Sequence, residues 1–376
     1  MSLIDFRSFS YFPAFRCSKG EHNGYVKLSD SDKKAIIPIA ELDRQGKSDS
    51  LAPSIHRVKA SIGDQPFILD LCKDYAPEVY ISKDPANPEA DKKRVEKETA
   101  SKAAYDALID DLLNPNNGFE NWRAFAAKFQ SAIPAVLYRN LADELAHVIV
   151  QAYSFAKEKR NFALRFQMDA DDMAVDLIKI ITPMLTRAGQ MLIVIDCGQG
   201  RINVKKRATV AKKIMEKANH VIGNDNFRKV RFVCMSSSFT QPKKENLEEY
   251  ECLDWDLWAL ATSGASCAFG DYMSVYRPKP ADYISGDIKP TVVCPLDDKW
   301  LVYRHKNNND VKGWRDGAQI VMKHIEYAPA PDVWGIRILE RTARDDKSFL
   351  EPKHWIAVKV NIHVHRQIKL ASSRCK

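Results

Sequence analysis

Ionisable side chains recur near the ends of apolar, strand-like segments throughout this sequence. They are the acids Glu41, Asp70, Asp196 and Asp271, the bases Lys19, Arg139 and Arg165, and the phenol of Tyr272. An unpaired charge beside an apolar run costs free energy, so these groups must pair with one another or with a ligand. Carboxylates gathered in one place can act as a general acid or base, and arginines can hold a phosphate or carboxylate. The pattern therefore predicts either a polar site or a closed network of salt bridges.

For the polar site, we assign catalytic roles to Glu41, Asp70, Asp196 and Asp271. Ligand-binding roles go to Lys19, Arg139, Arg165 and Tyr272. Arg139 and Arg165 end neighbouring strand-like segments and could clamp an anion with two hydrogen bonds each. Glu41 and Asp70 are also neighbours in this sense, and they could hold a divalent cation. The cofactor stays unknown, and no metal site is assigned. His363 and His365 could face one side of an extended strand, but no third ligand lies near them in sequence, so we interpret them as a polar face.

The segments that must position these groups alternate between two types. Eight short runs rich in β-branched and aromatic residues predict strands. They span residues 11–17, 35–42, 66–72, 132–138, 161–168, 191–197, 230–236 and 267–276. Segments between them repeat apolar residues every three or four positions and predict helices. They span residues 49–62, 119–129, 141–159, 169–188, 204–221 and 245–262, with further helices at 313–327 and 334–342.

Alternating strands and helices imply parallel strands joined by right-handed crossovers. Eight such units in about 300 residues match the size of a (β/α)8 barrel. The competing architecture is an open doubly wound sheet, which normally carries a glycine-rich turn after its first strand. Here that turn reads Ser18-Lys19-Gly20-Glu21 and lacks the pattern. We therefore predict a single barrel domain over residues 1–376.

Two insertions and a tail interrupt the barrel pattern. Residues 73–118 follow the third strand and include a charged run at 91–98 that predicts a solvated helix. Residues 279–312 follow the eighth strand, and their two alternating segments predict a β-hairpin. Residues 350–376 form a tail packing on the barrel, in which 355–370 alternates like a strand. Both insertions follow strands, so they lie on the face where barrels bind ligands.

Composition narrows the class of protein. The 376 residues are 45% hydrophobic and 28% charged, which is ordinary for a globular protein and excludes intrinsic disorder. The eight cysteines form no CxxC pair, so we expect free thiols in a reducing compartment. The first residues resemble no signal peptide and no apolar run approaches the length of a membrane span. The expected location is the cytoplasm, without membrane association.

The net charge of +8 makes nucleic acid a candidate partner. A basic stretch within the predicted helix at 204–221 carries Lys205, Lys206, Arg207 and Lys213. Such a face could contact phosphates, although basic outer helices are more often simply solvated.

Three short motifs coincide with one known family. They are the opening Tyr11-Phe12-Pro13-Ala14-Phe15-Arg16-Cys17-Ser18-Lys19-Gly20-Glu21, then Ile37-Pro38-Ile39-Ala40-Glu41-Leu42, and later Phe269-Gly270-Asp271-Tyr272. Together they resemble the beta protein family of bacteriophages and of mobile or defence-associated bacterial loci. The resemblance implies a barrel-like domain and a phage or antiviral-defence setting, and it brings no settled activity.

Two functions follow as hypotheses. In the first, the barrel mouth binds or processes an anionic ligand, such as a phosphorylated compound or nucleotide. In the second, the chain is a non-catalytic interaction protein that binds a protein partner or nucleic acid through its insertions and basic helix. An open mouth with unpaired Arg139 and Arg165 favours the first hypothesis, and a filled, self-paired mouth favours the second.

Overall fold

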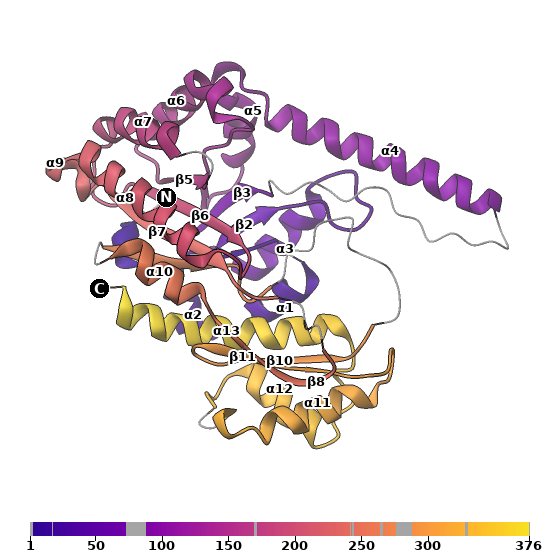
Figure 1. Ribbon diagram of the computed structural model, residues 1–376. Helices are drawn as coiled ribbons and strands as arrows, with labels where there is room; N and C mark the ends of the chain where they lie inside the picture. The colour runs from indigo at the N-terminus through magenta and orange to yellow at the C-terminus, as the bar shows by residue number, and fades with distance from the viewer. Residues whose placement is uncertain are drawn as a thin grey trace.

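The fold is taken from a computed structural model. It describes residues 3–16, 18–72, 88–168, 171–240, 242, 244–263, 266–275, 288–327 and 330–375. Two layers are visible in Figure 1: a large barrel above and a small sheet with its helices below, with one long helix between them.

The barrel consists of eight parallel strands, as the sequence predicts. These are β1 (Tyr11–Phe15), β2 (Ile39–Leu42), β3 (Phe67–Leu71), β4 (Ala132–Pro134), β5 (Phe162–Gln167), β6 (Met191–Gln199), β7 (Val230–Ser237) and β9 (Cys267–Asp271). Their order in the sheet is β4-β3-β2-β1-β9-β7-β6-β5. A bridge between Ala135 and Ala163 joins the two outer strands, and the amide of Val136 donates to the carbonyl of Ala163 at 2.8 Å. This single bridge nearly closes the barrel, and the (β/α)8 prediction is confirmed.

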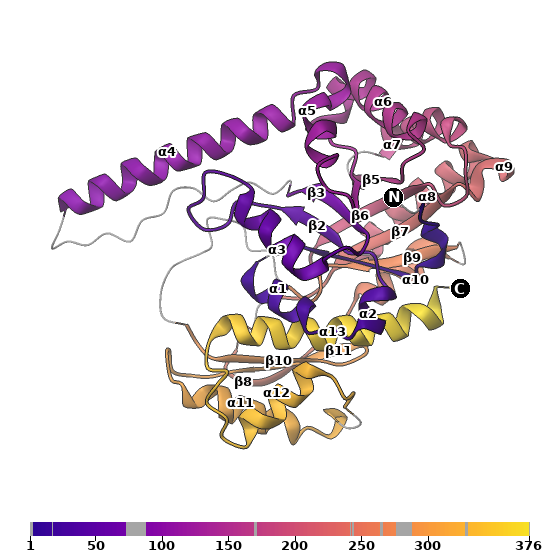
Figure 2. The same cartoon turned by 180° about the vertical axis from the view of Figure 1, so that it is seen from behind.

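Helices cover the outside of the barrel in the expected alternation. They are α1 (Lys19–Val26), α2 (Asp30–Lys34), α3 (Ala52–Ile62), α4 (Pro88–Leu112), α5 (Asn116–Ala126), α6 (Leu141–Lys157), α7 (Asp171–Ile181), α8 (Val204–Ile222), α9 (Asn224–Phe227) and α10 (Asp254–Thr262). Short 3-10 turns lie at η1 (Phe6–Ser8) and η2 (Thr182–Met184). The predicted charged helix in the first insertion forms part of α4, which extends well away from the barrel in Figures 1 and 2.

The second layer is a three-stranded antiparallel sheet with its own hydrophobic core. The predicted hairpin is present as β10 (Thr291–Pro295) and β11 (Lys299–Arg304), and β11 also pairs with β8 (Asn246–Glu251). Helices α11 (Lys312–Met322) and α12 (Trp334–Ala343), with the turn η4 (Ile325–Tyr327), complete this layer. Residues 279–287 of the predicted insertion lie outside the described residues.

Two secondary-structure predictions are wrong. Residues 245–262 do not form one helix, because their first part is the edge strand β8 and only the second part is α10. The alternating segment 355–370 is not a strand, because it lies inside the 23-residue helix α13 (Pro352–Arg374). His363 and His365 therefore do not share a face, and they contact different parts of the molecule.

Helix α13 joins the two layers. Val360, Val364 and Ala371 pack into the barrel core, whereas Val358 and Ile362 pack into the core of the small sheet. The helix lies between the two layers in both ribbon views. It follows β9 in the barrel sequence and so occupies the place of the eighth outer helix.

Two glycines of α1 allow α13 to approach closely. A methyl group on Gly20 would lie 2.6 Å from Cβ of Ile356, and one on Gly24 would lie 2.7 Å from the carbonyl oxygen of Ala357. The side chain of Asn361 uses this proximity, donating to the carbonyl of Gly24 at 3.4 Å and accepting from the amide of Gly335 at 2.8 Å. Asn361 thereby ties α1 and α12 to α13.

The structure also bears on the predicted free thiols and on the predicted lack of membrane spans. Seven cysteines are free thiols, five of them on or beside buried strands, while Cys17 lies outside the described residues. Among the helices of the described ranges, none combines the length and the apolar character needed to cross a bilayer.

We expect Gly24→Ala to destabilise the protein by about 1–3 kcal/mol, because the added methyl group meets a backbone carbonyl that cannot move aside easily. This outcome opposes helix propensity, which favours alanine over glycine by about 1 kcal/mol. Urea denaturation measures the difference, with Asn23→Ala on the same helix as control. Equal or greater stability of Gly24→Ala would show that α1 does not depend on this close contact.

Candidate functional site

The barrel mouth holds one compact group of polar side chains. This mouth cluster consists of Glu41 on β2, Asp70 on β3, Arg165 on β5, Asp196 on β6 and Tyr272 directly after β9. Glu41 and Asp70 are register partners in neighbouring parallel strands, so they point to the same side of the sheet. All five side chains were predicted for the site, and the structure brings them together.

Arg165 is the centre of the mouth cluster. Its Nη1 donates to Oε1 of Glu41 at 2.5 Å and to Oδ2 of Asp70 at 3.0 Å. Its Nε and Nη2 donate to Oδ2 of Asp196 at 3.0 and 2.7 Å. Nη2 also reaches the hydroxyl of Tyr272 at 3.0 Å, and that hydroxyl lies 2.6 Å from Oδ2 of Asp196. One guanidinium thus contacts three carboxylates.

The mouth cluster is buried, and burial sets its electrostatics. Glu41 and Asp70 are 1% exposed and Arg165 is 7% exposed. Burial alone would lower the pKa of Arg165, but Asp196, Tyr272 and Asp70 hold it well above its ordinary value. Arg165 therefore stays positively charged.

Backbone groups fix the cluster further. The amide of Leu71 donates to Oδ1 of Asp70 at 2.8 Å, and the amide of Gly198 donates to Oδ1 of Asp196 at 2.9 Å. The hydroxyl of Tyr138 donates to the carbonyl of Arg165 at 2.8 Å. These contacts hold the carboxylates of Asp70 and Asp196 and the backbone of Arg165 in place, which is a property of a rigid network.

Asp271 does not join the mouth cluster, so its predicted place is wrong. Successive residues of a strand point to opposite faces, and Tyr272 takes the inner side. Asp271 points outward to α13, where it accepts from the hydroxyl of Tyr11 at 2.7 Å and lies 2.6 Å from Nε2 of His363. It is 2% exposed. Asp271 thus fastens β1 and β9 to α13.

Arg139 and Lys19 also lie away from the mouth cluster. Arg139 comes five residues after the end of β4, is half-exposed and pairs with Asp110 of α4. Lys19 is exposed at the first position of α1. The expectation that Arg139 and Arg165 form one anion clamp is therefore wrong.

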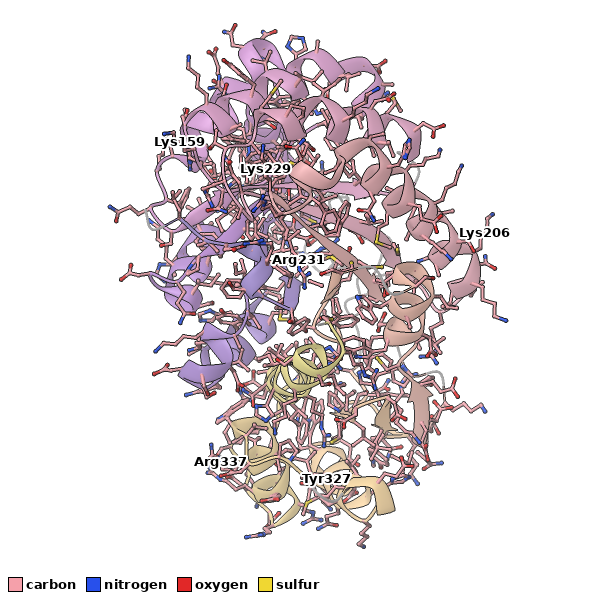
Figure 3. The ribbon with its side chains drawn as sticks, turned by 90° about the vertical axis from the view of Figure 1, so that its left-hand side faces the viewer. Lys159, Lys206, Lys229, Arg231, Tyr327 and Arg337 are labelled. Carbon is pink, nitrogen blue, oxygen red and sulfur yellow. The ribbon has the colours of Figure 1, made fainter. Side chains whose placement is uncertain are left out.

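The predicted nucleic-acid helix is α8, and its four basic residues differ in surroundings. Lys205, Lys206 and Lys213 are exposed. Arg207 instead turns inward, and its Nη1 donates to the carbonyl of Cys197 in β6 at 2.7 Å. Lys206 lies at the edge of the molecule in Figure 3.

Asp254 and Lys359 are among the buried ionisable residues that the sequence analysis does not name. Asp254 at the start of α10 accepts hydrogen bonds from the hydroxyls of Ser236 and Ser238, both at 2.8 Å. Burial, followed by the charge of Asp271, raises its pKa. His363 and Lys359 lie on α13, in the segment predicted to be a strand. A buried acid after a serine-rich strand end is a signal that sequence alone could have supplied.

Lys359 is a buried cation without a carboxylate in contact among the described residues. It is 7% exposed, and its Nζ lies 4.0 Å from the centre of the Phe239 ring. Burial lowers its pKa to about 7, and the more distant charge of Glu21 opposes this only in part. Within the same described part of the chain, no group of three histidine, cysteine or acidic side chains is placed to hold a metal ion.

The sequence is similar to those of known proteins. The sequence model of the family described as "Beta protein" matches residues 11–369. The chain belongs to this family. It is 25% identical over 375 residues to "Protein beta" of Enterobacteria phage P4, an alignment that covers 98% of this chain and 96% of that protein. No solved structure matches. The family assignment confirms the resemblance seen in the motifs, and the P4 relative places the family in phages.

We expect Arg165→Met to destabilise the protein by about 3–5 kcal/mol, because three buried carboxylates lose the cation that they share. Arg139→Met is the matched control and should change stability by about 1 kcal/mol or less, since its ion pair is exposed. Thermal and urea denaturation measure both. Similar small changes in the two variants would contradict a structural role for the mouth cluster.

The buried Lys359 makes the stability of the folded protein depend on pH. Between about pH 7 and 10.5 the unfolded chain binds more protons at this lysine than the folded chain does, so its contribution makes stability rise with pH in that window. Lys359→Met should remove this rise and stabilise the protein at neutral pH, by at most about 5 kcal/mol. Urea denaturation from pH 6 to 10 tests it, with the exposed Lys369→Met as control. An unchanged pH profile in Lys359→Met would refute the assignment.

Proposed function

We propose that this chain is a non-catalytic interaction protein of a phage or of a bacterial antiviral defence. In this proposal it acts in the cytoplasm and binds a protein partner through segments outside the barrel wall. The mouth cluster then serves to hold the barrel together.

The observation that carries this proposal is the self-pairing of Arg165. The first hypothesis, an anionic ligand at the mouth, needs a free guanidinium there. Arg165 instead contacts Glu41, Asp70 and Asp196, so three carboxylates face one cation. A phosphate or carboxylate entering this cluster would meet more negative than positive charge. The charge count therefore speaks against an anionic ligand at this place.

Helix α4 is the segment best placed to bind a partner. Its C-terminal half is anchored, since Tyr105 and Leu112 are buried in the barrel core. Glu98 also forms a buried ion pair with Arg44 at 3.1 Å. The part before Glu98 extends away from the barrel in Figure 2, and its side chains from Lys92 to Lys97 are exposed. A rigid helix with one anchored end presents the other end to a second molecule at no further cost in chain ordering.

Substitution of Val95 tests whether α4 binds the partner. Val95 is 44% exposed on α4, and Val150 on α6 is 45% exposed, so Val95→Asp and Val150→Asp form a matched pair. Affinity purification of the tagged full chain from phage-infected bacteria supplies the partner. We expect a stoichiometric partner to be lost with Val95→Asp and kept with Val150→Asp.

Two results would overturn the proposal. In one, the partner binds both variants equally, which would separate binding from α4. In the other, nucleotides or sugar phosphates raise the melting temperature of the native chain but not that of an Asp70→Asn variant. That result would restore a ligand site at the mouth.

A further inference from the structure

The end of the barrel opposite the mouth carries a group of cations that no predicted role uses. This basic end consists of residues on three consecutive strand entries. They are Lys159 and Arg160 before β5, Arg187 before β6, Arg228 and Lys229 before β7, and Arg231 within β7. Strands β5, β6 and β7 are neighbours in the barrel. Figure 3 looks onto this end, where the labelled Lys159, Lys229 and Arg231 lie together, apart from Lys206.

Backbone hydrogen bonds hold the three entries in one surface. The amide of Gly189 donates to the carbonyl of Arg228 at 2.9 Å, and the amide of Gln190 donates to that of Lys229 at 2.8 Å. The side chain of Gln190 donates to the carbonyl of Arg160 at 3.2 Å. The backbone positions from which the cations extend are therefore fixed by the barrel itself.

Few carboxylates neutralise this surface. Asp5 bonds to Arg7, and Glu158 pairs with Arg160 at 3.6 Å. Within the described ranges, the other five cations of the basic end form no ion pair with an acid, and Asp225 of α9 is the remaining acid near them in sequence. On α8, by contrast, Lys217 pairs with Asp172 and Lys212 with Glu216.

Among the described residues, the guanidinium groups of Arg231 and Arg187 form hydrogen bonds to neutral acceptors and not to carboxylates. Arg231 is only 7% exposed, and its Nη1 donates to the hydroxyl of Ser266 at 2.7 Å. Arg187 donates to the carbonyl of Ile4 at 2.9 Å and to Oδ1 of Asn161 at 2.6 Å. All these acceptors are neutral. Burial lowers the pKa of both arginines, and the charge of Asp5 opposes this effect only in part. A negatively charged ligand would relieve this excess.

We propose that the basic end binds the sugar-phosphate backbone of a nucleic acid without reading its sequence. Arg228 is exposed, and its planar guanidinium matches phosphate oxygens with two parallel hydrogen bonds. The exposed Lys159 and the half-buried Lys229 add point charges beside it, while Arg231 and Arg187 add positive charge from within the surface. The strand entries that carry these residues are fixed by the barrel, which suits a polymer with regularly spaced phosphates. This binding is independent of the protein partner proposed above, because it uses the opposite end of the barrel from the strand-following insertions.

Binding of fluorescein-labelled 30-nucleotide DNA, single-stranded and duplex, tests the proposal by fluorescence anisotropy over a range of salt concentrations. The test variant carries Lys159→Glu, Arg228→Glu and Lys229→Glu, and leaves the buried arginines in place. The control variant carries Lys205→Glu, Lys206→Glu and Lys213→Glu on α8, which changes the net charge by the same amount. Thermal melts check that both fold.

We expect the native chain to bind with an affinity that falls steeply with salt, and the test variant to bind at least tenfold more weakly. Loss of three phosphate contacts should reduce the slope of log affinity against log salt by about 2–3. The control should stay within about twofold of the native chain. Equal weakening of both variants would show a net-charge effect only and overturn the proposal. No DNA binding by the native chain, or binding to vesicles with anionic lipid but not to DNA, would overturn it as well.

Discussion

One helix packs into two hydrophobic cores at once. Helix α13 presents Val360 and Val364 to the barrel and Val358 and Ile362 to the small sheet, so it is buried on nearly every side between residues 357 and 364. Its polar side chains must then find partners inside the protein. Asn361 bonds to α1 and α12, His363 to Asp271, and Gln367 accepts from Nε1 of Trp255 at 2.7 Å. The arrangement of both layers follows from this shared helix.

The same burial explains why the sequence misleads at this place. A surface helix shows apolar residues every three or four positions, but a helix enclosed on all sides does not. The alternation of Val358, Val360, Ile362 and Val364 then resembles a strand that faces water on one side. Strand β8 is missed for another reason: it pairs with β11 some fifty residues further on, and nothing within its own six residues records that contact.

The barrel and most of the mouth cluster could be predicted because their signals are local. Each barrel strand is a short, continuous apolar run, and Glu41, Asp70, Arg165 and Asp196 lie near the ends of such runs. Parallel strands in a closed barrel bring those ends together. The three failures are also local in origin, and Lys19 fails because it is exposed at the first position of α1. Asp271 and Tyr272 are adjacent and cannot both face inward, while Arg139 lies too far past β4 to stay in the mouth. Lys359 could not be found, because its burial depends on α13 being a helix.

The position of α13 in the chain has a consequence for synthesis. All eight barrel strands and the β10–β11 hairpin leave the ribosome before residue 352, but neither core is covered until α13 follows them. Until then the indole N–H of Trp255, whose ring stacks on Phe269, lacks its acceptor on Gln367. The carboxylate of Asp271 likewise lacks its hydrogen-bond partner His363. A nascent chain that stalls before this helix exposes apolar surface of both layers, which is what chaperones and proteases recognise. Burial of both hydrophobic cores therefore waits for the synthesis of α13.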